Sequence, residues 1–322
     1  MKDDLIHRAE LRGFITRTEI LDSGYLDRDI REAIAIGLLT RIGSGLYAVS
    51  RTYTALTFDQ RHAVRSRAVF QRHLQSVVLT HQSAAIMHGL PVWGLSLDEV
   101  HVTRRDHGRG RHEAGVQHHT GRIPDADIVE IDGALVSSPS RCVWEVACSA
   151  STEAGLVTAD AAAHRGLVTP ENLGETAATF AHWQGSRSAR ITTRLIDPRA
   201  ESPGESRSRH LFWRFDVPMP DLQHRVLDAR GRQIARTDFG WELWRHLAEF
   251  DGRIKYDGTF TPEGFESVFD EKRREDSIRA QEWGMSRIVW ADLEPARAPH
   301  TAARILADLD RSRSRYGRRV VL

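Results

Sequence analysis

The stretch Arg236-Thr-Asp-Phe-Gly-Trp241, followed shortly by Leu247-Ala-Glu-Phe-Asp-Gly-Arg-Ile-Lys-Tyr256, contains two short apolar runs, each compatible with a buried strand. Asp238 interrupts the first run, and Glu249 and Asp251 interrupt the second. Because carboxylates on adjacent strands repel one another, they usually persist only where something positive shares the site. A divalent metal ion is the simplest candidate, so these runs predict a metal-facing acidic edge of an α/β domain.

Magnesium-assisted phosphodiester cleavage would explain this carboxylate pattern, since it needs acidic ligands that leave positions on the ion for water and phosphate. Asp238 and Glu249 can supply ligands from neighbouring strands, and Asp251 shares a strand face with Glu249 because residues i and i+2 point the same way. Lys255 can fold back as a cation near the developing charge, and Glu205 is an outer ligand or base-positioning candidate. We therefore predict Mg²⁺ as the cofactor, with Asp238, Glu249 and Asp251 as its ligands.

A purely structural interpretation of the same carboxylates stays open. Asp238 or Asp251 could cap a turn beside Gly240 or Gly252, because short acidic side chains accept hydrogen bonds from nearby backbone amides. That role requires no metal ion.

The apolar pattern from residue 202 onward predicts the order helix, strand, strand, strand, helix, strand, helix. The expected elements cover residues 205–215, 223–228, 233–239, 247–250, 271–283, 286–291 and 300–313.

This section, over about residues 202–311, resembles the very-short-patch-repair-type endonuclease-like domain of the PD-(D/E)XK superfamily. The resemblance rests on Glu205, Asp238, Glu249-Phe-Asp-Gly252, Glu271-Lys-Arg-Arg-Glu-Asp-Ser-Ile-Arg-Ala-Gln-Glu-Trp-Gly284 and Arg287-Ile-Val-Trp290. It implies a restriction-endonuclease-like fold and Mg²⁺-dependent DNA cleavage, with Asp238 in place of the motif's Asp and Glu249 in place of its (D/E). Asp251 stands where the motif has Lys, so both an active enzyme and a catalytically silent fold are expected alternatives.

The first fifty residues predict three short helices followed by a hairpin with a glycine-containing turn. Their order is that of a winged helix-turn-helix, in which the third helix enters the DNA major groove and the turn approaches phosphates. The expected DNA-binding residues are Arg28, Arg31, Arg41 and Ser44. One Lys and six Arg against five Asp and three Glu leave a protein-binding winged helix as the alternative.

The pattern of residues 51–200 predicts an α+β section, and this section contains a basic loop and several histidines. Arg104, Arg105, Arg109 and Arg111 are candidates for phosphate contact, with a solvated loop tip as the alternative. The histidines lack tight ligand spacing, so we interpret them as scattered surface residues. They are His101, His107, His112, His118 and His119.

The first two sections together resemble the AbiEi-type antitoxins and transcriptional regulators of phage-defence systems. The matching segments are Gly13-Phe-Ile-Thr-Arg-Thr-Glu-Ile-Leu21, Gly43-Ser-Gly-Leu-Tyr-Ala48 and Leu79-Thr-His-Gln-Ser-Ala-Ala85. The resemblance implies a leading winged helix, operator binding and, in type IV pairs, counteraction of a nucleotidyltransferase-like toxin.

Composition adds limits on these hypotheses. The 322 residues are enough for two or three domains, and a net charge of +1 requires any basic surface to be local. Cys142 and Cys148 are too few for a disulfide scaffold or a four-cysteine zinc site. We find no signal peptide and no apolar run near the ~20 residues of a membrane span, so we expect a cytoplasmic protein.

We therefore predict a multidomain α+β protein with a winged helix-turn-helix at 1–50, an AbiEi-like α+β domain at 51–200 and a restriction-endonuclease-like α/β domain at 201–322. The predicted function is a DNA-binding protein of phage defence or a toxin–antitoxin pair, with a Mg²⁺-dependent endonuclease domain. The alternative is a non-enzymatic regulator or type IV antitoxin. The expected partners are DNA, a nucleotidyltransferase-like toxin and a second copy of the chain, without a membrane.

Overall fold

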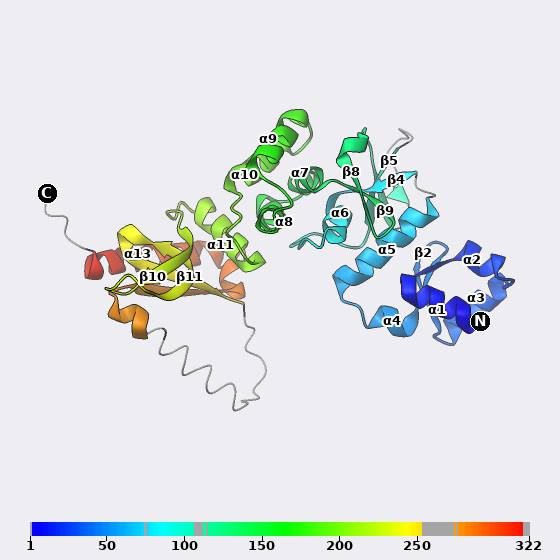
Figure 1. Ribbon diagram of the computed structural model, residues 1–322, viewed down its shortest axis with the longest axis horizontal. Helices are drawn as coiled ribbons and strands as arrows, with labels where there is room; N and C mark the ends of the chain where they lie inside the picture. The colour runs from blue at the N-terminus through cyan, green and yellow to red at the C-terminus, as the bar shows by residue number, and fades with distance from the viewer. Residues whose placement is uncertain are drawn as a thin grey trace, which may run out of the picture. The chain divides into compact units, whose positions relative to one another are not determined.

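The computed structural model describes residues 2–73, 76–105, 112–113, 115–252, 274 and 276–317, with only the backbone at 112–113. The chain forms two compact units (Figure 1). The first comprises residues 1–162 and 166–194, and the second comprises residues 163–165 and 195–322. Both units combine helices with a sheet, which confirms the multidomain α+β class. The division at residues 50 and 200 into three domains stays a prediction.

Three helices and a small antiparallel sheet occupy the start of the first unit. They are α1 (Asp3–Arg12), β1 (Ile15–Thr16), α2 (Arg17–Asp22), α3 (Asp27–Ala35), β2 (Leu39–Gly43) and β3 (Leu46–Val49), with strand order β1-β3-β2. Gly13 ends α1 at φ +87°, a conformation that glycine adopts without strain. The predicted helices and hairpin are confirmed here, whereas β1 is too short for its residues to show an alternating pattern.

The buried side chains of this region join all three helices to the sheet. Leu5, Ile20, Ile30, Leu39 and Val49 are each at most 4% exposed and pack in one cluster. Apolar residues at helical spacing thus face a common core, as the sequence pattern predicts.

The rest of the first unit is built around a six-stranded sheet of order β6-β7-β5-β4-β9-β8. Its strands are β4 (Val77–Leu79), β5 (Val100–Arg104), β6 (His112–Glu113), β7 (Val116–His119), β8 (Ile128–Ile131) and β9 (Ala134–Ser137). Its helices are α4 (Ser50–Thr54), α5 (Phe58–Arg72), α6 (His81–Met87), η1 (Asp125–Asp127), α7 (Pro139–Ser149), α8 (Thr152–His164), α9 (Pro170–Thr179) and α10 (Ser186–Leu195). Strand β5 pairs antiparallel with β4 and parallel with β7. Helix α6 begins just after β4, beside β5.

The second unit has a four-stranded sheet of order β10-β11-β12-β13, with β13 parallel to β12 and the other pairs antiparallel. Its elements are α11 (Pro203–Arg214), β10 (Asp221–Leu227), β11 (Gln233–Trp241), η2 (Glu242–Trp244), β12 (His246–Asp251), β13 (Gly284–Val289), η3 (Trp290–Leu293) and α13 (Ala298–Tyr316). Residues 274 and 276–280 are helical, within the predicted helix 271–283. The predicted order of elements is therefore confirmed where the structure describes it.

Apolar side chains cover both faces of this sheet. Phe212 of α11 and Ile305 of α13 pack with Phe239 of β11, and all three are fully buried. A second cluster joins Leu247 of β12 to Ile278. Among the helices that the structure describes, none has the length and apolar character needed to cross a membrane.

Candidate functional site

The acidic group predicted from β11 and β12 is assembled in the second unit. Asp238 Oδ2 accepts a hydrogen bond of 2.7 Å from the Phe250 amide, which fixes the carboxylate against the neighbouring strand. Burial, together with the nearby carboxylates of Glu205, Glu249 and Glu201, raises the pKa of Asp238 to about 6, against the lowering effect of the hydrogen bond from the Phe250 amide. Residues from α11, β11 and β12 thus lie close enough to interact electrostatically.

Two members of the predicted set are paired with arginines. The Arg274 guanidinium donates to both oxygens of Glu249, at 2.7 Å to Oε1 and 2.8 Å to Oε2. Asp251 Oδ2 lies 3.7 Å from Arg287 Nη1 on β13. The parallel pairing of β12 and β13 places Arg287 opposite Glu249, and so near Asp251 two residues along the strand.

Glu205 has a structural role at the start of α11. Its Oε1 accepts from the Ser202 hydroxyl at 2.7 Å, and its Oε2 accepts from the Glu201 amide at 3.0 Å and from Gln223 Nε2 at 2.8 Å. The Ser202 hydroxyl in turn accepts from the Glu205 amide at 3.2 Å. These bonds cap the helix N-terminus, where a carboxylate is also favoured by the helix dipole.

As arranged, the carboxylates do not fit the predicted three-ligand Mg²⁺ site. A metal site of this kind needs three ligand atoms close to one another. Among the described residues, three such atoms from His, Cys, Asp or Glu lie within 4.8 Å of one another only in a group of histidines of the first unit, and not among these carboxylates. Glu249 already accepts two charge-assisted hydrogen bonds from Arg274, which a metal ion would have to displace. Lys255, the predicted cation, lies outside the described residues.

The predicted DNA-binding residues of the first fifty positions are all exposed. Arg28 and Arg31 lie on α3, Arg41 on β2 and Ser44 in the turn between β2 and β3. The Ser44 carbonyl accepts a hydrogen bond of 3.1 Å from Arg72 Nη1, which ties this turn to α5.

The basic loop of the middle section is only partly described. Arg104 is the last residue of β5, and the exposed Arg105 Nη2 lies 3.1 Å from Asp125 Oδ1. Arg109 and Arg111 lie outside the described residues.

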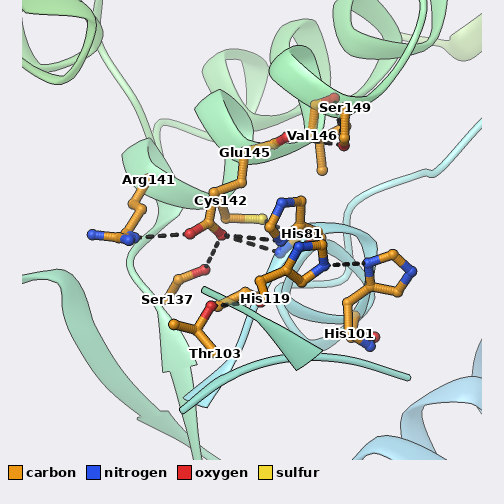
Figure 2. Close-up of polar contacts among 12 residues, drawn as sticks. His81, His101, Thr103, His119, Ser137, Arg141, Cys142, Glu145, Val146 and Ser149 are labelled. Carbon is orange, nitrogen blue, oxygen red and sulfur yellow. Dashed lines mark hydrogen bonds and ion pairs between the residues drawn. The ribbon is translucent and has the colours of Figure 1, made fainter. Parts of the chain in front are cut away.

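Three histidines of the first unit meet in a cluster. We define it as His81 at the start of α6, His101 on β5 and His119 on β7 (Figure 2). His101 Nδ1 lies 2.8 Å from His119 Nε2, and the rings of His81 and His119 stack with centroids 3.7 Å apart and planes at 14°. The interpretation of His101 and His119 as scattered surface histidines is therefore wrong.

The pairing of β5 with β7 explains why the sequence did not reveal the cluster. These strands run parallel, with His101 opposite Gln117, so His119 lies two residues along the same face of the sheet. His81 lies on a third element, at the start of α6. Of the other histidines, His118 is buried and lies between Gln117 and His119 on β7, so its side chain points to the opposite face of the sheet. His112 is described only in its backbone, and His107 lies outside the described residues.

A buried ion pair supports the cluster from α7. Arg141 Nε donates to Glu145 Oε1 at 2.8 Å, and both side chains are at most 2% exposed. Glu145 Oε2 accepts from the His81 amide and from the Ser137 hydroxyl, each at 3.1 Å, as Figure 2 shows. Burial lowers the pKa of His81 to about 3, and the charge on Arg141 contributes, so this imidazole is neutral at neutral pH.

His81 and His119 line a cavity of about 720 Å³ together with Glu145, Cys148 and Trp183. Burial, with a contribution from Glu145, raises the pKa of the Cys148 thiol to about 11. Cys148 is therefore a protonated thiol at neutral pH and a poor nucleophile. The arrangement suits ligand or metal binding by imidazoles better than thiolate chemistry.

Comparison with known protein families gives a match to the leading part of the chain. Residues 3–50 match the family described as "Transcriptional regulator, AbiEi antitoxin". The AbiEi match covers α1 through β3, and neither the histidine cluster nor the acidic group lies within it.

Two curated relatives come from Mycobacterium tuberculosis, the uncharacterized proteins Rv2248 and MT2308. Each is 29% identical over 190 residues, which span 58% of this chain and 66% of the relative. The chain thus matches slightly less than two thirds of each relative's length. A solved structure, that of the RV2827C protein from Mycobacterium tuberculosis, is 13% identical with a TM-score of 0.39, covering 67% of this chain and 83% of that one.

Proposed function

We propose that this chain is a DNA-binding transcriptional regulator of the AbiEi antitoxin type, associated with phage defence, whose leading region is a winged helix that binds an operator. One observation carries the proposal: the AbiEi match at residues 3–50 coincides with three helices followed by a two-stranded hairpin. In a winged helix the third helix enters the major groove and the hairpin turn approaches the backbone.

The charges on α3 support this orientation. Asp27 is held by Arg17, with Nη2 to Oδ2 at 2.6 Å, and Asp29 Oδ2 accepts from the Leu26 amide at 2.7 Å. Both carboxylates are in the first turn, where the helix dipole favours them. Arg28 and Arg31 remain exposed to contact DNA, and Arg41 lies near the turn of the hairpin for phosphate contact.

Fluorescence anisotropy on a duplex from the gene's own upstream region tests operator binding. We expect the double variant Arg28→Ala/Arg31→Ala to bind about tenfold or more weakly and to show a shallower salt dependence, because each lost phosphate contact reduces the slope by about 1. Arg8→Ala is the matched control, since Arg8 is exposed on α1 and lies 3.3 Å from Asp4. Equal affinity of the double variant and the wild type would count against the proposal.

The antitoxin part of the proposal concerns a protein partner. The AbiEi family description supports a cognate toxin, and we propose a nucleotidyltransferase-like protein encoded beside this chain. Co-expression tests this directly: the chain should relieve growth arrest by the adjacent gene product. Unrelieved arrest at full expression of the chain would exclude that toxin as the partner.

A Mg²⁺-dependent DNA endonuclease is the second candidate function. It is favoured by the position of the partly buried Asp238 near Glu205 and Glu249, where burial first and then these carboxylates raise the Asp238 pKa, and by the element order of the second unit. Glu249 and Asp251 face arginines, and three ligand atoms do not converge among the described carboxylates, so a Mg²⁺ ion would have to displace these arginines to bind.

Nicking assays on supercoiled DNA with Mg²⁺ or Mn²⁺ distinguish the two functions. An active nuclease should lose cleavage in Asp238→Asn and Glu249→Gln. A silent fold should leave DNA intact in all three proteins while still binding the operator through the leading region. Cleavage that persists unchanged in both variants would exclude these residues as the active site.

A further inference from the structure

We infer that the histidine cluster, His81, His101 and His119, is a binding site for a transition-metal dication, with Zn²⁺ as the expected ion. One ring nitrogen from each histidine lies within 4.8 Å of the other two, and this is the one such group among the residues described. Neither the AbiEi match, which ends at residue 50, nor the proposed DNA-binding function involves these residues.

The spacing of two of the nitrogens is close to that of a metal site. His101 Nδ1 and His119 Nε2 are 2.8 Å apart. A tetrahedral Zn²⁺ with Zn–N bonds of about 2.0–2.1 Å separates its ligand nitrogens by roughly 3.3 Å. The two rings therefore need to part by about half an ångström for the ion to replace the hydrogen bond between them. Both residues lie on paired strands, so their backbones are already in place.

His81 supplies a second and independent observation. Its side chain is nine-tenths buried, and its Nδ1 finds no hydrogen-bond partner among the described residues. Leaving a buried polar atom without a partner is energetically unfavourable, so such an atom commonly marks a place where an ion or water completes the site. His81 also has φ +53°, a strained backbone conformation of the kind that collects at functional sites.

Outer groups are placed to orient the histidines. Gln82 Nε2 lies 2.7 Å from His101 Nε2, and Glu145 Oε2 accepts a hydrogen bond of 3.1 Å from the His81 amide. Metal-bound histidines typically direct their second nitrogen at an amide oxygen or a carboxylate, which sets the tautomer. When His101 Nδ1 binds the metal, rotation of the Gln82 amide by half a turn presents the amide oxygen to His101 Nε2, which then donates a hydrogen bond to it.

The donor set selects the class of ion. Three imidazole ligands suit Zn²⁺, Co²⁺, Ni²⁺ or Cu²⁺, whereas Mg²⁺ and Ca²⁺ prefer oxygen ligands. Glu145 is already balanced by Arg141, with Oε1 to Nε at 2.8 Å, so it acts as an outer group rather than as a fourth ligand.

The cavity indicates what completes the coordination. His81 and His119 both lie in the wall of the 720 Å³ cavity, so a metal between them has access to water or to an oxygen-bearing ligand from that space. Three protein ligands with an open fourth position are the arrangement of exchangeable, ligand-binding zinc sites rather than of closed structural ones.

Metal binding to the full chain tests the site. Protein treated with EDTA and exchanged into buffer is titrated with Zn²⁺ by calorimetry and with Co²⁺ by visible absorption. We expect one Zn²⁺ per chain, and d–d bands from Co²⁺ held by nitrogen ligands. In His119→Phe, which keeps an aromatic ring stacked on His81, and in His101→Gln, affinity should fall at least tenfold. The surface control His7→Ala should bind as the wild type does.

Circular dichroism checks that each variant is folded. The two substitutions lie on different strands, so the test still stands if one of the variants fails to fold. A wild-type chain that binds no Zn²⁺, or folded His101→Gln and His119→Phe proteins that bind it as tightly as the wild type, would overturn the inference. Operator binding by the arginines of α3 is measured separately, so failure of one proposal leaves the other standing.

Discussion

Arg274 covers the carboxylate of Glu249 with two parallel hydrogen bonds, at 2.7 and 2.8 Å, where the PD-(D/E)XK resemblance places a metal ligand. A guanidinium thus supplies the positive charge that the sequence pattern led us to assign to Mg²⁺. The pair is mostly buried, with side chains 28% and 15% exposed. It gives the carboxylate a protein partner that needs no metal.

Replacing Arg274 should therefore destabilise the second unit. Arg274→Ala leaves Glu249 partly buried beside Asp238 without its cation, at a cost of about 1–3 kcal/mol in the free energy of unfolding. Arg274→Lys keeps the charge without the double hydrogen bond and should cost less. Urea unfolding at pH 7.5 in EDTA measures both, and equal stability of Arg274→Ala and the wild type would refute the role of the pair. If added Mg²⁺ restores the stability of Arg274→Ala but does not change that of the wild type, the ion and the arginine compete for one site.

Asp238 should make the stability of the second unit fall as pH rises. Its pKa of about 6 in the folded chain lies above the unfolded value of about 3.9, so the folded state binds the extra proton. This contribution is fully present below about pH 4 and is lost as pH rises through about 6.

Asp238→Asn should remove that dependence, because Asn keeps an oxygen to accept from the Phe250 amide but carries no charge. We expect the variant to be more stable than the wild type at pH 8 by about 1–3 kcal/mol, after allowance for partial exposure, with the difference vanishing near pH 4. Chemical unfolding of both proteins across this range gives the difference curve. A flat curve would show that the burial and repulsion at Asp238 are not significant in solution.

The Arg141–Glu145 pair should be among the most sensitive positions of the first unit. Arg141→Met leaves the Glu145 carboxylate buried without its partner, which costs about 3–5 kcal/mol. Adding Glu145→Gln removes the stranded charge and keeps an acceptor for the His81 amide, so the double variant should recover part of the loss. Thermal unfolding of the single and double variants tests this, and a double variant less stable than Arg141→Met would contradict the charge explanation.

The leading region should depend on the cap of α2. Thr16 Oγ1 accepts from the Glu19 amide at 3.2 Å, and Glu19 Oε2 accepts from the Thr16 amide at 2.8 Å. Thr16→Ala should cost about 1 kcal/mol, whereas Thr18→Ala on the exposed face of the same helix should change little. Amide hydrogen exchange in residues 3–50 measures the stability of this region in each variant. Equal protection in Thr16→Ala and Thr18→Ala would show that the cap does not stabilise the region.

Much of the secondary structure followed from the sequence alone. The helices of residues 3–35 and of 298–316, and the strands β10 to β13, were predictable because their apolar residues recur at helical or strand spacing and glycines punctuate them. Local patterns are visible in sequence since they concern residues a few positions apart. The nearness of Asp238 to Glu249 was predictable for the same reason, because a short connection joins adjacent strands.

Tertiary structure decided which of these residues meet and with what. Arg274 reaches Glu249 across 25 residues, and His81 reaches Glu145 across 64. No local period encodes such contacts. His101 and His119 stand 18 residues apart with no ligand spacing, yet the parallel pairing of β5 with β7 and the start of α6 beside them bring three imidazoles together. The sequence by itself determined where carboxylates and histidines stand along each element. Tertiary structure, through sheet pairing and through the packing of helical residues against the sheets, determined that Glu249 and Asp251 face arginines and that the histidines converge.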